Sequence, residues 1–322
     1  MAAHTVTYLD FEKPVAELEG KIAELEALHE RDDTADVAEE VERLRGKAKD
    51  HLSQLYGHLD AWRKTQVARH PHRPHFSYFR DALITDFVAL AGDRGFAEDH
   101  AIQGGLGWLR GRSVVVLGHE KGEDTESRLK HNFGMARPEG YRKAVRLMTL
   151  AEDFGLPVVA FVDTAGAYPG IGAEERGQAQ AIAKAIDRGL SLNVPFVAVV
   201  TGEGGSGGAV ALASADQVLM LEHAVYSVIS PEGCASILWR DAAKAKEAAN
   251  AMKITAQDLE KFKIVDTIVP EPMGGAHRDR SHAAEAVGDA IEAALDALVT
   301  LSPGDRKAAR RERFLRIGRE GL

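Results

Sequence analysis

The amino-acid sequence predicts an α/β protein, in which helices cover a sheet of buried strands and a helical arm precedes this body. Short apolar runs alternate with longer amphipathic segments from about residue 102 onward. Within that region, a unit of strand, glycine-rich loop and helix occurs twice. The residues before Arg69, by contrast, show only helical periodicity. Together these patterns divide the chain into residues 1–68, a core over 69–275 and a helical segment over 276–322.

The N-terminal part is predicted to form a hairpin of two helices. Apolar residues recur at intervals of three and four over residues 15–25 and again over 37–62, with the polar stretch RDDTAD between them. This spacing places one apolar stripe along each helix. Asp36 and Glu39 resemble a capping pair at the start of the second helix. Neither helix sustains enough heptads for an autonomous coiled coil, so we expect the hairpin to pack on the body or on a partner.

The proline-rich segment ARHPHRP, residues 68–74, ends the helical pattern and marks a boundary. Its histidines, with His75 just beyond, suggest a metal site. The prolines stiffen the backbone against such convergence, and no carboxylate motif accompanies them. We therefore expect a connector on the surface.

The remainder of the chain supplies the sheet and its covering helices. Buried strands are predicted at residues 113–118, 156–164, 194–201, 217–222 and 265–269. Helices are predicted at 138–155 and 173–189, closing on glycine caps at Gly155 and Gly189. The tail from Ser281 is predicted to be helical, with charges that face solvent or a partner.

The two repeated units begin at Val158 and at Val194. Crossover connections between parallel strands bring the loops that follow those strands to one edge of the sheet. The loops at residues 163–178 and 202–208 should therefore converge, and we expect the functional site there.

The composition narrows the possible functions. A formal net charge of −9 argues against general binding to nucleic acid or to an anionic membrane, which needs an excess of lysine and arginine. The single cysteine, Cys234, excludes an internal disulfide and a multi-cysteine zinc site. No apolar run is long enough to cross a bilayer, and the N-terminus does not resemble a signal peptide, so we expect a cytoplasmic protein.

One local cluster of basic residues could hold phosphate groups, and a solvated helix face is an equally good interpretation of it. The cluster consists of Arg128, Lys130, His131, Arg137, Arg142, Lys143 and Arg146.

The turn at residues 202–208 fits three chemistries. Gly202, Gly204 and Gly207 match the dinucleotide fingerprint GxGxxG, whereas Gly204, Ser206 and Gly208 match the hydrolase elbow GxSxG. In the third interpretation no side chain is needed, because the backbone amides at a helix start can stabilise an oxyanion.

Each interpretation has its own support. Ser206 is followed by Asp266 and His277 in the order nucleophile, acid, base, which keeps a serine hydrolase open. The dinucleotide fingerprint has an acidic residue, Glu222, at a suitable distance but no partner for hydride transfer nearby. A plain tight turn would need only one or two glycines, and this turn has five in seven positions.

Four segments carry a resemblance to a known family. HNFGMARPEGYRKAVRLM, DTAGAYPGIGAEERGQ, GEGGSGGA and SVISPEGCASILW, in this order, resemble the carboxyltransferase alpha subunits of bacterial acetyl-CoA carboxylase. The resemblance implies a crotonase-like (ClpP/crotonase) fold of repeated ββα units behind the helical arm. It also implies transfer of a carboxyl group from carboxybiotin to acetyl-CoA, which forms malonyl-CoA for fatty acid biosynthesis.

The resemblance further implies partners. These are a beta subunit that brings a zinc ribbon and half of the active site, a biotin carboxyl carrier protein, and biotin carboxylase, with the carboxyltransferase as an alpha2beta2 heterotetramer. No metal is expected in this chain. A non-catalytic scaffold subunit remains the alternative from a different functional class.

The resemblance also assigns roles to residues. Release of the carboxyl group leaves negative charge on the ureido oxygen of biotin, and enolisation leaves it on acetyl-CoA, so two oxyanion holes are needed. In this chain the amides of Gly207 and Gly208 match the hole on the biotin side, with Gly204 and Gly205 shaping the turn. The residues that match the lining of the cleft are Gly166, Ala167, Tyr168, Pro169 and Gly170.

Overall fold

A single mixed sheet of eight strands forms the centre of the computed structural model, which describes residues 7–31 and 37–319. The strand order is β1-β2-β3-β4-β5-β6-β8, and the short strand β7 pairs with the end of β5. The first three strands are antiparallel, and those from β3 onward are parallel. The strands are β1 (Ile84–Ala89), β2 (Ile102–Leu109), β3 (Arg112–His119), β4 (Val158–Thr164), β5 (Phe196–Gly205), β6 (Gln217–Leu221), β7 (Val225–Ser227) and β8 (Thr267–Val269).

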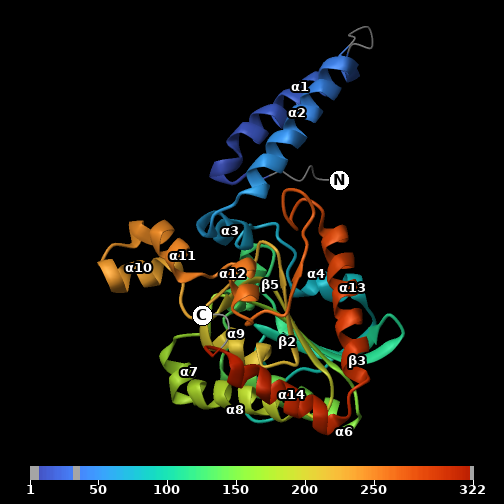
Figure 1. Ribbon diagram of the computed structural model, residues 1–322, viewed down its shortest axis with the longest axis vertical. Coiled ribbons are helices and arrows are strands. Elements are labelled where there is room, and N and C mark those ends of the chain that lie inside the picture. The colour runs from blue at the N-terminus through green and yellow to red at the C-terminus, as the bar shows by residue number, and fades with distance from the viewer. Residues whose placement is uncertain (1–6, 32–36, 320–322) are drawn as a thin grey trace.

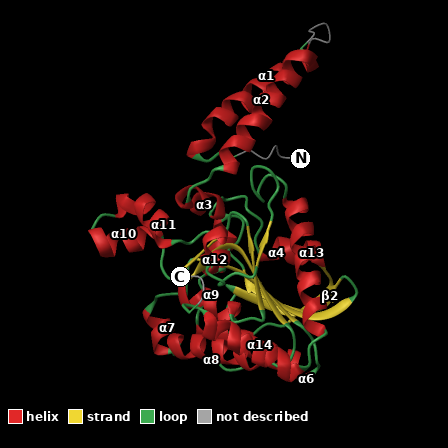
Figure 2. Cartoon of the chain, in the orientation of Figure 1, coloured by secondary structure: helices red, strands yellow, loops and turns green. Residues whose placement is uncertain are grey.

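The five strands predicted from apolar runs are all present, which confirms the α/β class. Every residue of β4 is buried, because helices cover both faces of the parallel part of the sheet. Figure 2 shows the yellow strands between two groups of red helices. The antiparallel strands β1 and β2 were not predicted. The glycines of β2 hide its strand character, and a Cβ on Gly105 would lie only 2.1 Å from the Val88 carbonyl oxygen of β1.

Helices α6 (Pro138–Asp153), α8 (Gln178–Ser191) and α9 (Ser206–Ala213) cover one face of the sheet, and α4 (Phe76–Leu83) and α13 (Arg280–Val299) cover the other (Figure 1). The remaining helices of the body are α5 (Thr125–Lys130), α7 (Ile171–Glu175), α10 (Pro231–Trp239), α11 (Ala245–Met252), α12 (Ala256–Lys261) and α14 (Pro303–Arg316), with single 3₁₀ turns at Asp10–Glu12, Asn132–Gly134 and Ala242–Lys244. Within the described ranges, none of the helices has the length and apolar character needed to cross a membrane.

The predicted helix at 138–155 is confirmed, and Gly155 follows its end in a left-handed conformation. The predicted helix at 173–189 is wrong in two respects. It is divided into α7 and α8 at Gly177, whose φ of 80° interrupts the helical conformation. Gly189 is also no cap, because α8 continues to Ser191. The absence of a side chain at Gly189 instead leaves room for the Ser214 carbonyl oxygen, which a Cβ would approach to 3.0 Å.

The predicted helical hairpin is confirmed as α1 (Lys13–Arg31) and α2 (Ala38–Gly57), which project from the body in Figure 1. Ile22 on α1 packs with Val41 and Leu44 on α2 between the two helices. The N-cap of α2 is Val37, which has no side-chain capping bond, and the predicted capping residue Asp36 lies outside the described residues. A third helix, α3 (Ala61–Ala68), packs against α11 on the body.

Most of the connector after α3 is buried, although Pro71 is exposed, which corrects the prediction of a surface segment. His70 is 2% exposed, Arg73 is fully buried and His75 is 6% exposed. Burial of these polar side chains is possible because each has a polar partner: His70 contacts the carbonyl oxygen of Thr7 in the N-terminal segment, and in the body Arg73 pairs with Glu271 and His75 with Asp163.

The predicted C-terminal helices are confirmed as α13 and α14, but the expected solvated charge face of α14 is wrong for three arginines. Arg306, Arg310 and Arg313 are buried. Arg310 donates to Asp216 at 2.8 and 2.7 Å and to the carbonyl oxygens of Gly189, Leu192 and Val194. These bonds tie α14 to the end of α8 and to the loop that enters β5, where carbonyl groups have no partner in the helix or the sheet.

Candidate active site

The loops that follow β4 and β5 meet at the carboxyl edge of the parallel sheet, as the repeated unit predicts. A Cβ on Gly205 would lie 2.2 Å from the carbonyl oxygen of Ala165. A Cβ on Gly208 would lie 2.9 Å from the backbone nitrogen of Ala167. Only glycine permits this approach of one backbone to the other.

Helix α9 begins directly at the end of β5, with Gly205 as its N-cap. Gly207 and Gly208 lie in its first turn, where the backbone N–H groups have no carbonyl partner one turn earlier. A Cβ on Gly207 would touch only the Ile182 side chain, at 3.5 Å, and the residue is partly exposed. The helix dipole adds positive potential at this end. The arrangement is suited to an anionic oxygen.

The loop after β4 is held by its own hydrogen bonds. Gly166 has a φ of 149°, which other residues rarely adopt. The Thr164 hydroxyl accepts from the Gly166 N–H at 3.1 Å and donates to its carbonyl oxygen at 2.7 Å. Further along, the Tyr168 N–H donates to the Ala136 carbonyl oxygen, and the Arg137 guanidinium lies over the Tyr168 ring. These contacts fix the loop next to the start of α9.

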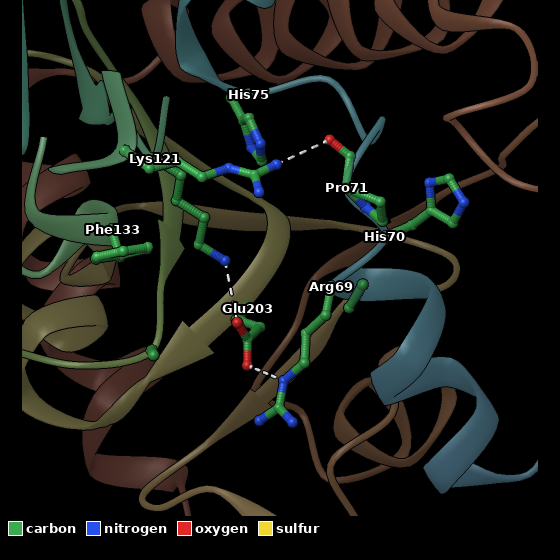
Figure 3. A pocket seen from close by; sticks show the side chains of 10 residues that line it. Arg69, His70, Pro71, His75, Lys121, Phe133 and Glu203 are labelled. Carbon is green, nitrogen blue, oxygen red and sulfur yellow. Dashed lines mark hydrogen bonds and ion pairs between the residues drawn. The ribbon is translucent and has the colours of Figure 1, made fainter. Parts of the chain in front are cut away.

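A cleft of roughly 240 Å³ lies beside this glycine turn. Figure 3 shows Lys121 and Arg69 both pointing toward Glu203 in this cleft. Its lining comprises Ala68, Arg69, His70, Pro71, His75, Lys121, Arg128, Phe133, Ala165 and Glu203. A second, narrow cleft is lined by Gly204 and Gly205 among others. Gly207 and Gly208 line neither of these two clefts. A Cβ on Gly207 would face Ile182 on α8, whereas a Cβ on Gly208 would face the backbone of Gly166 and Ala167.

A buried network of charges underlies the turn. Lys121 Nζ lies 2.7 Å from Asp163 Oδ1 and 3.0 Å from Glu203 Oε2, and Arg69 Nε lies 2.6 Å from Glu203 Oε1. His75 Nδ1 lies 3.0 Å from Asp163 Oδ2. Burial opposes ionisation of Asp163, but Lys121 and His75 hold its pKa well below the ordinary value. The Asp163 carboxylate is therefore charged at neutral pH.

Sequence reasoning did not assign a role to Lys121, Asp163 or Glu203. A signal was present, because Asp163 and Glu203 both interrupt apolar runs near the ends of predicted strands. A buried carboxylate at such a place needs a cation, and the sequence does not show which cation is near.

The serine-hydrolase arrangement is not assembled. The His277 ring stacks on His70, with 3.8 Å between ring centroids, and its two nitrogens have no hydrogen-bond partner among the described residues. Burial lowers the pKa of His277 to about 2. Asp266 is bound instead by Arg313 and by the Val218 N–H. Ser206 therefore lacks the base that a nucleophile requires.

Most of the basic cluster is engaged within the protein. Arg142 pairs with Asp93 and Glu139, and Lys143 is buried in a pair with Glu98. Arg146 donates to the carbonyl oxygens of residues 90–92. In the described residues, no three or more histidine, cysteine, aspartate or glutamate side chains are grouped to hold a metal ion.

Comparison with known proteins identifies the family. Residues 8–318 match the family described as acetyl co-enzyme A carboxylase carboxyltransferase-like. The chain belongs to this family.

Related proteins match this chain over nearly their full length. The acetyl-coenzyme A carboxylase carboxyl transferase subunit alpha of Azorhizobium caulinodans is 65% identical over 313 residues, which cover 97% of this chain and 99% of that protein. The protein of the same name from Caulobacter vibrioides is 62% identical over 322 residues, 100% of both chains. Among solved structures, a chain of the Pseudomonas malonate decarboxylase hetero-tetramer in complex with coenzyme A matches with a TM-score of 0.59 and 17% identity, over 75% of this chain and 96% of that one.

These matches confirm the carboxyltransferase interpretation, and they favour it over the serine hydrolase and the non-catalytic scaffold. The fold shared with the decarboxylase chain agrees with the crotonase-like class. As an acetyl-CoA carboxylase carboxyltransferase, the protein takes part in fatty acid biosynthesis.

Proposed function

We propose that this chain binds carboxybiotin, presented by a biotin carboxyl carrier protein, and helps to transfer its carboxyl group to acetyl-CoA. The observation that carries this proposal is the start of α9, where Gly207 and Gly208 lie in the first turn beside the loop at 166–170. Carboxybiotin supplies the carboxyl group when it is bound. The backbone of this chain supplies the electrostatic stabilisation.

In this mechanism the Gly207 and Gly208 amides donate hydrogen bonds to the ureido oxygen of biotin, where negative charge develops. Preorganised amides at a helix start stabilise such charge without reorganising, and loss of one such donor typically costs about 10²–10³-fold in kcat. Gly207 is partly exposed and has no side chain, which leaves an oxygen room to approach its amide. Gly204 and Gly205 set the direction of the turn.

Gly166, Ala167, Tyr168, Pro169 and Gly170 form the wall beside these amides in the proposed site. This loop touches the turn at Gly205 and Gly208, so the amides and the wall form one unit. The Arg137–Tyr168 contact then keeps the aromatic side chain in a fixed place.

We further propose that the enzyme works in the cytoplasm as an alpha2beta2 heterotetramer with a beta subunit that bears the zinc ribbon, together with the carrier protein and biotin carboxylase. The name "subunit alpha" of the relatives supports a second kind of subunit. With Cys234 as its single cysteine, this chain cannot itself supply a zinc ribbon. In this assembly the beta subunit provides the oxyanion hole for the enolate of acetyl-CoA.

The proposal is tested by purifying the chain with and without a co-expressed beta subunit and measuring malonyl-CoA formation from acetyl-CoA and carboxybiotin. We expect turnover only from the complex. Gly208→Val should abolish turnover, since the side chain enters the Gly166–Ala167 backbone. Gly207→Val should also do so, because a side chain there occupies the space beside the amides; its Cβ itself would meet only Ile182, at 3.5 Å. Gly46→Ala, on an open face of α2, is the control and should retain wild-type turnover. An inactive wild-type complex, or turnover that survives both valine variants, contradicts the proposal.

A further inference from the structure

Strand β5 contains two extra residues where the glycine turn begins. Val162 of β4 pairs with Val200 of β5, but Thr164, two residues later, pairs with Gly204, four residues later. The irregularity therefore lies in the segment 201–203. Bulges of this kind bend a strand and redirect the residues that follow. In this protein the residues that follow are Gly204, Gly205 and the start of α9.

The Asp163 side chain fills this irregularity. Its Oδ1 accepts the Glu203 backbone N–H at 2.9 Å, and a Cβ on Gly202 would lie 2.4 Å from the same oxygen. The side chain is 2% exposed. Lys121 on the loop after β3 and His75 on the buried connector hold the carboxylate at 2.7 and 3.0 Å. The carboxylate thus joins β4, the loop after β3 and the connector to the bulge.

We infer that Asp163 is a positioning residue of the carboxyltransferase reaction, whose carboxylate fixes the bulge in β5 and thereby aims the Gly207 and Gly208 amides. Few residues separate Asp163 from these amides, and each of them is held by a contact. Gly204 is paired with Thr164 in the sheet, Gly205 abuts Ala165, and α9 begins at the next residue. The inference rests on the proposed function of those amides, and it adds a residue that touches neither substrate.

The same strand offers a matched control at its other end. Asp216 Oδ2 accepts the Phe196 N–H at 2.8 Å at the start of β5, and Arg310 Nη2 lies 2.7 Å from this oxygen. Asp163 and Asp216 are thus both buried carboxylates, each bonded to a β5 amide and to a cation. They differ in that only Asp163 lies beside the glycine turn.

The experiment compares Asp163→Asn and Asp216→Asn in the complex with the beta subunit. Both variants should lower the melting temperature. We expect Asp163→Asn to lower kcat by about 10²-fold with KM for acetyl-CoA changed less than about threefold, because misplaced amides lose transition-state stabilisation more than ground-state binding. Asp216→Asn should keep kcat within about threefold of wild type. Unchanged kcat in Asp163→Asn, or an equal loss in Asp216→Asn, would overturn the inference.

A second pair of variants keeps the inference testable where Asp163→Asn does not fold. His75→Leu removes one of the two side-chain donors to Asp163, and His75→Gln supplies an amide donor in its place. We expect a fall in kcat of about tenfold for leucine and recovery with glutamine. Equal kcat values for wild type and His75→Leu contradict the positioning role. If instead the wild-type complex is inactive, it is the proposed function that fails.

Discussion

Arg73 and Glu271 form an ion pair with two parallel hydrogen bonds, of 2.6 and 2.9 Å, and both side chains are fully buried. Arg73 Nε also donates to the Thr201 carbonyl oxygen at 2.7 Å, within the irregular segment of β5. Glu271 accepts the backbone N–H groups of His223 and Ala276. The pair thus joins the buried connector, β5 and the loop after β8, close to the candidate active site.

Replacing Arg73 by methionine should destabilise the protein strongly, because it leaves the Glu271 carboxylate buried without a cation. Loss of one partner of such a pair typically costs about 3–5 kcal/mol in the free energy of unfolding. Urea unfolding measures this quantity. Arg43→Met is the control, since Arg43 pairs with Glu40 on the exposed face of the arm, and its unfolding curve should match that of the wild type. A wild-type curve for Arg73→Met would contradict the buried pair.

The same pair predicts a pH dependence of stability. Burial opposes the charge of Glu271, but Arg73 outweighs it and lowers the pKa of this carboxyl to about 2. The stabilisation is therefore complete above the unfolded-state pKa near 4.3, and it is lost as the pH falls toward 2. Between pH 4.3 and 3, the wild-type free energy of unfolding should fall more steeply than that of Glu271→Gln, by at most about 1.4 kcal/mol per pH unit. Parallel slopes would contradict the lowered pKa.

Replacing Ser206 should leave carboxyl transfer intact, because His277 and Asp266 have other neighbours. Ser206 has a φ of 53°, a left-handed conformation that costs a non-glycine residue about 1–2 kcal/mol. Ser206→Gly should therefore keep kcat within about threefold and stabilise the fold by up to about 1 kcal/mol. Malonyl-CoA formation and thermal unfolding measure the two effects. Covalent labelling of Ser206 by an organophosphonate would contradict this prediction.

Arg310→Met should destabilise the chain without a direct effect on the site. Its guanidinium donates to Asp216 and to three carbonyl groups between the end of α8 and the start of β5, at the opposite end of the strand from the glycine turn. We expect a loss of about 3–5 kcal/mol in unfolding free energy. The kcat of the folded complex, measured well below its melting temperature, should stay near that of the wild type. Arg311→Met, on the exposed side of α14, should change neither quantity.

The central fold was predictable because its signals are local. Apolar runs define the parallel strands, and two strands followed by glycine loops place their loops at one edge. The glycine-rich strand β2 gave no such signal, because glycine has a low strand propensity. Its glycines are there to allow the close approach of β1.

The buried charges were not predictable in the same way. Arg73 lies in a polar, proline-rich segment that resembles a surface loop, and its partner is 198 residues away in the chain. The arginines of α14 did carry a signal, since positions 306, 310 and 313 are spaced by four and three residues on one helix face. Charge runs are usually solvated, and that general rule concealed the pattern.

The Arg310–Asp216 contact also bears on the order in which the protein can fold. All the strands of the sheet are synthesised before residue 310, so the start of β5 carries a carboxylate and several carbonyl groups without their partner while the chain is still growing. Helix α14 can therefore dock only after the whole sheet has been synthesised. Until it does, Asp216 lacks the cation that its buried carboxylate has in the complete structure, so completion of this part of the fold follows synthesis of the C-terminal helix.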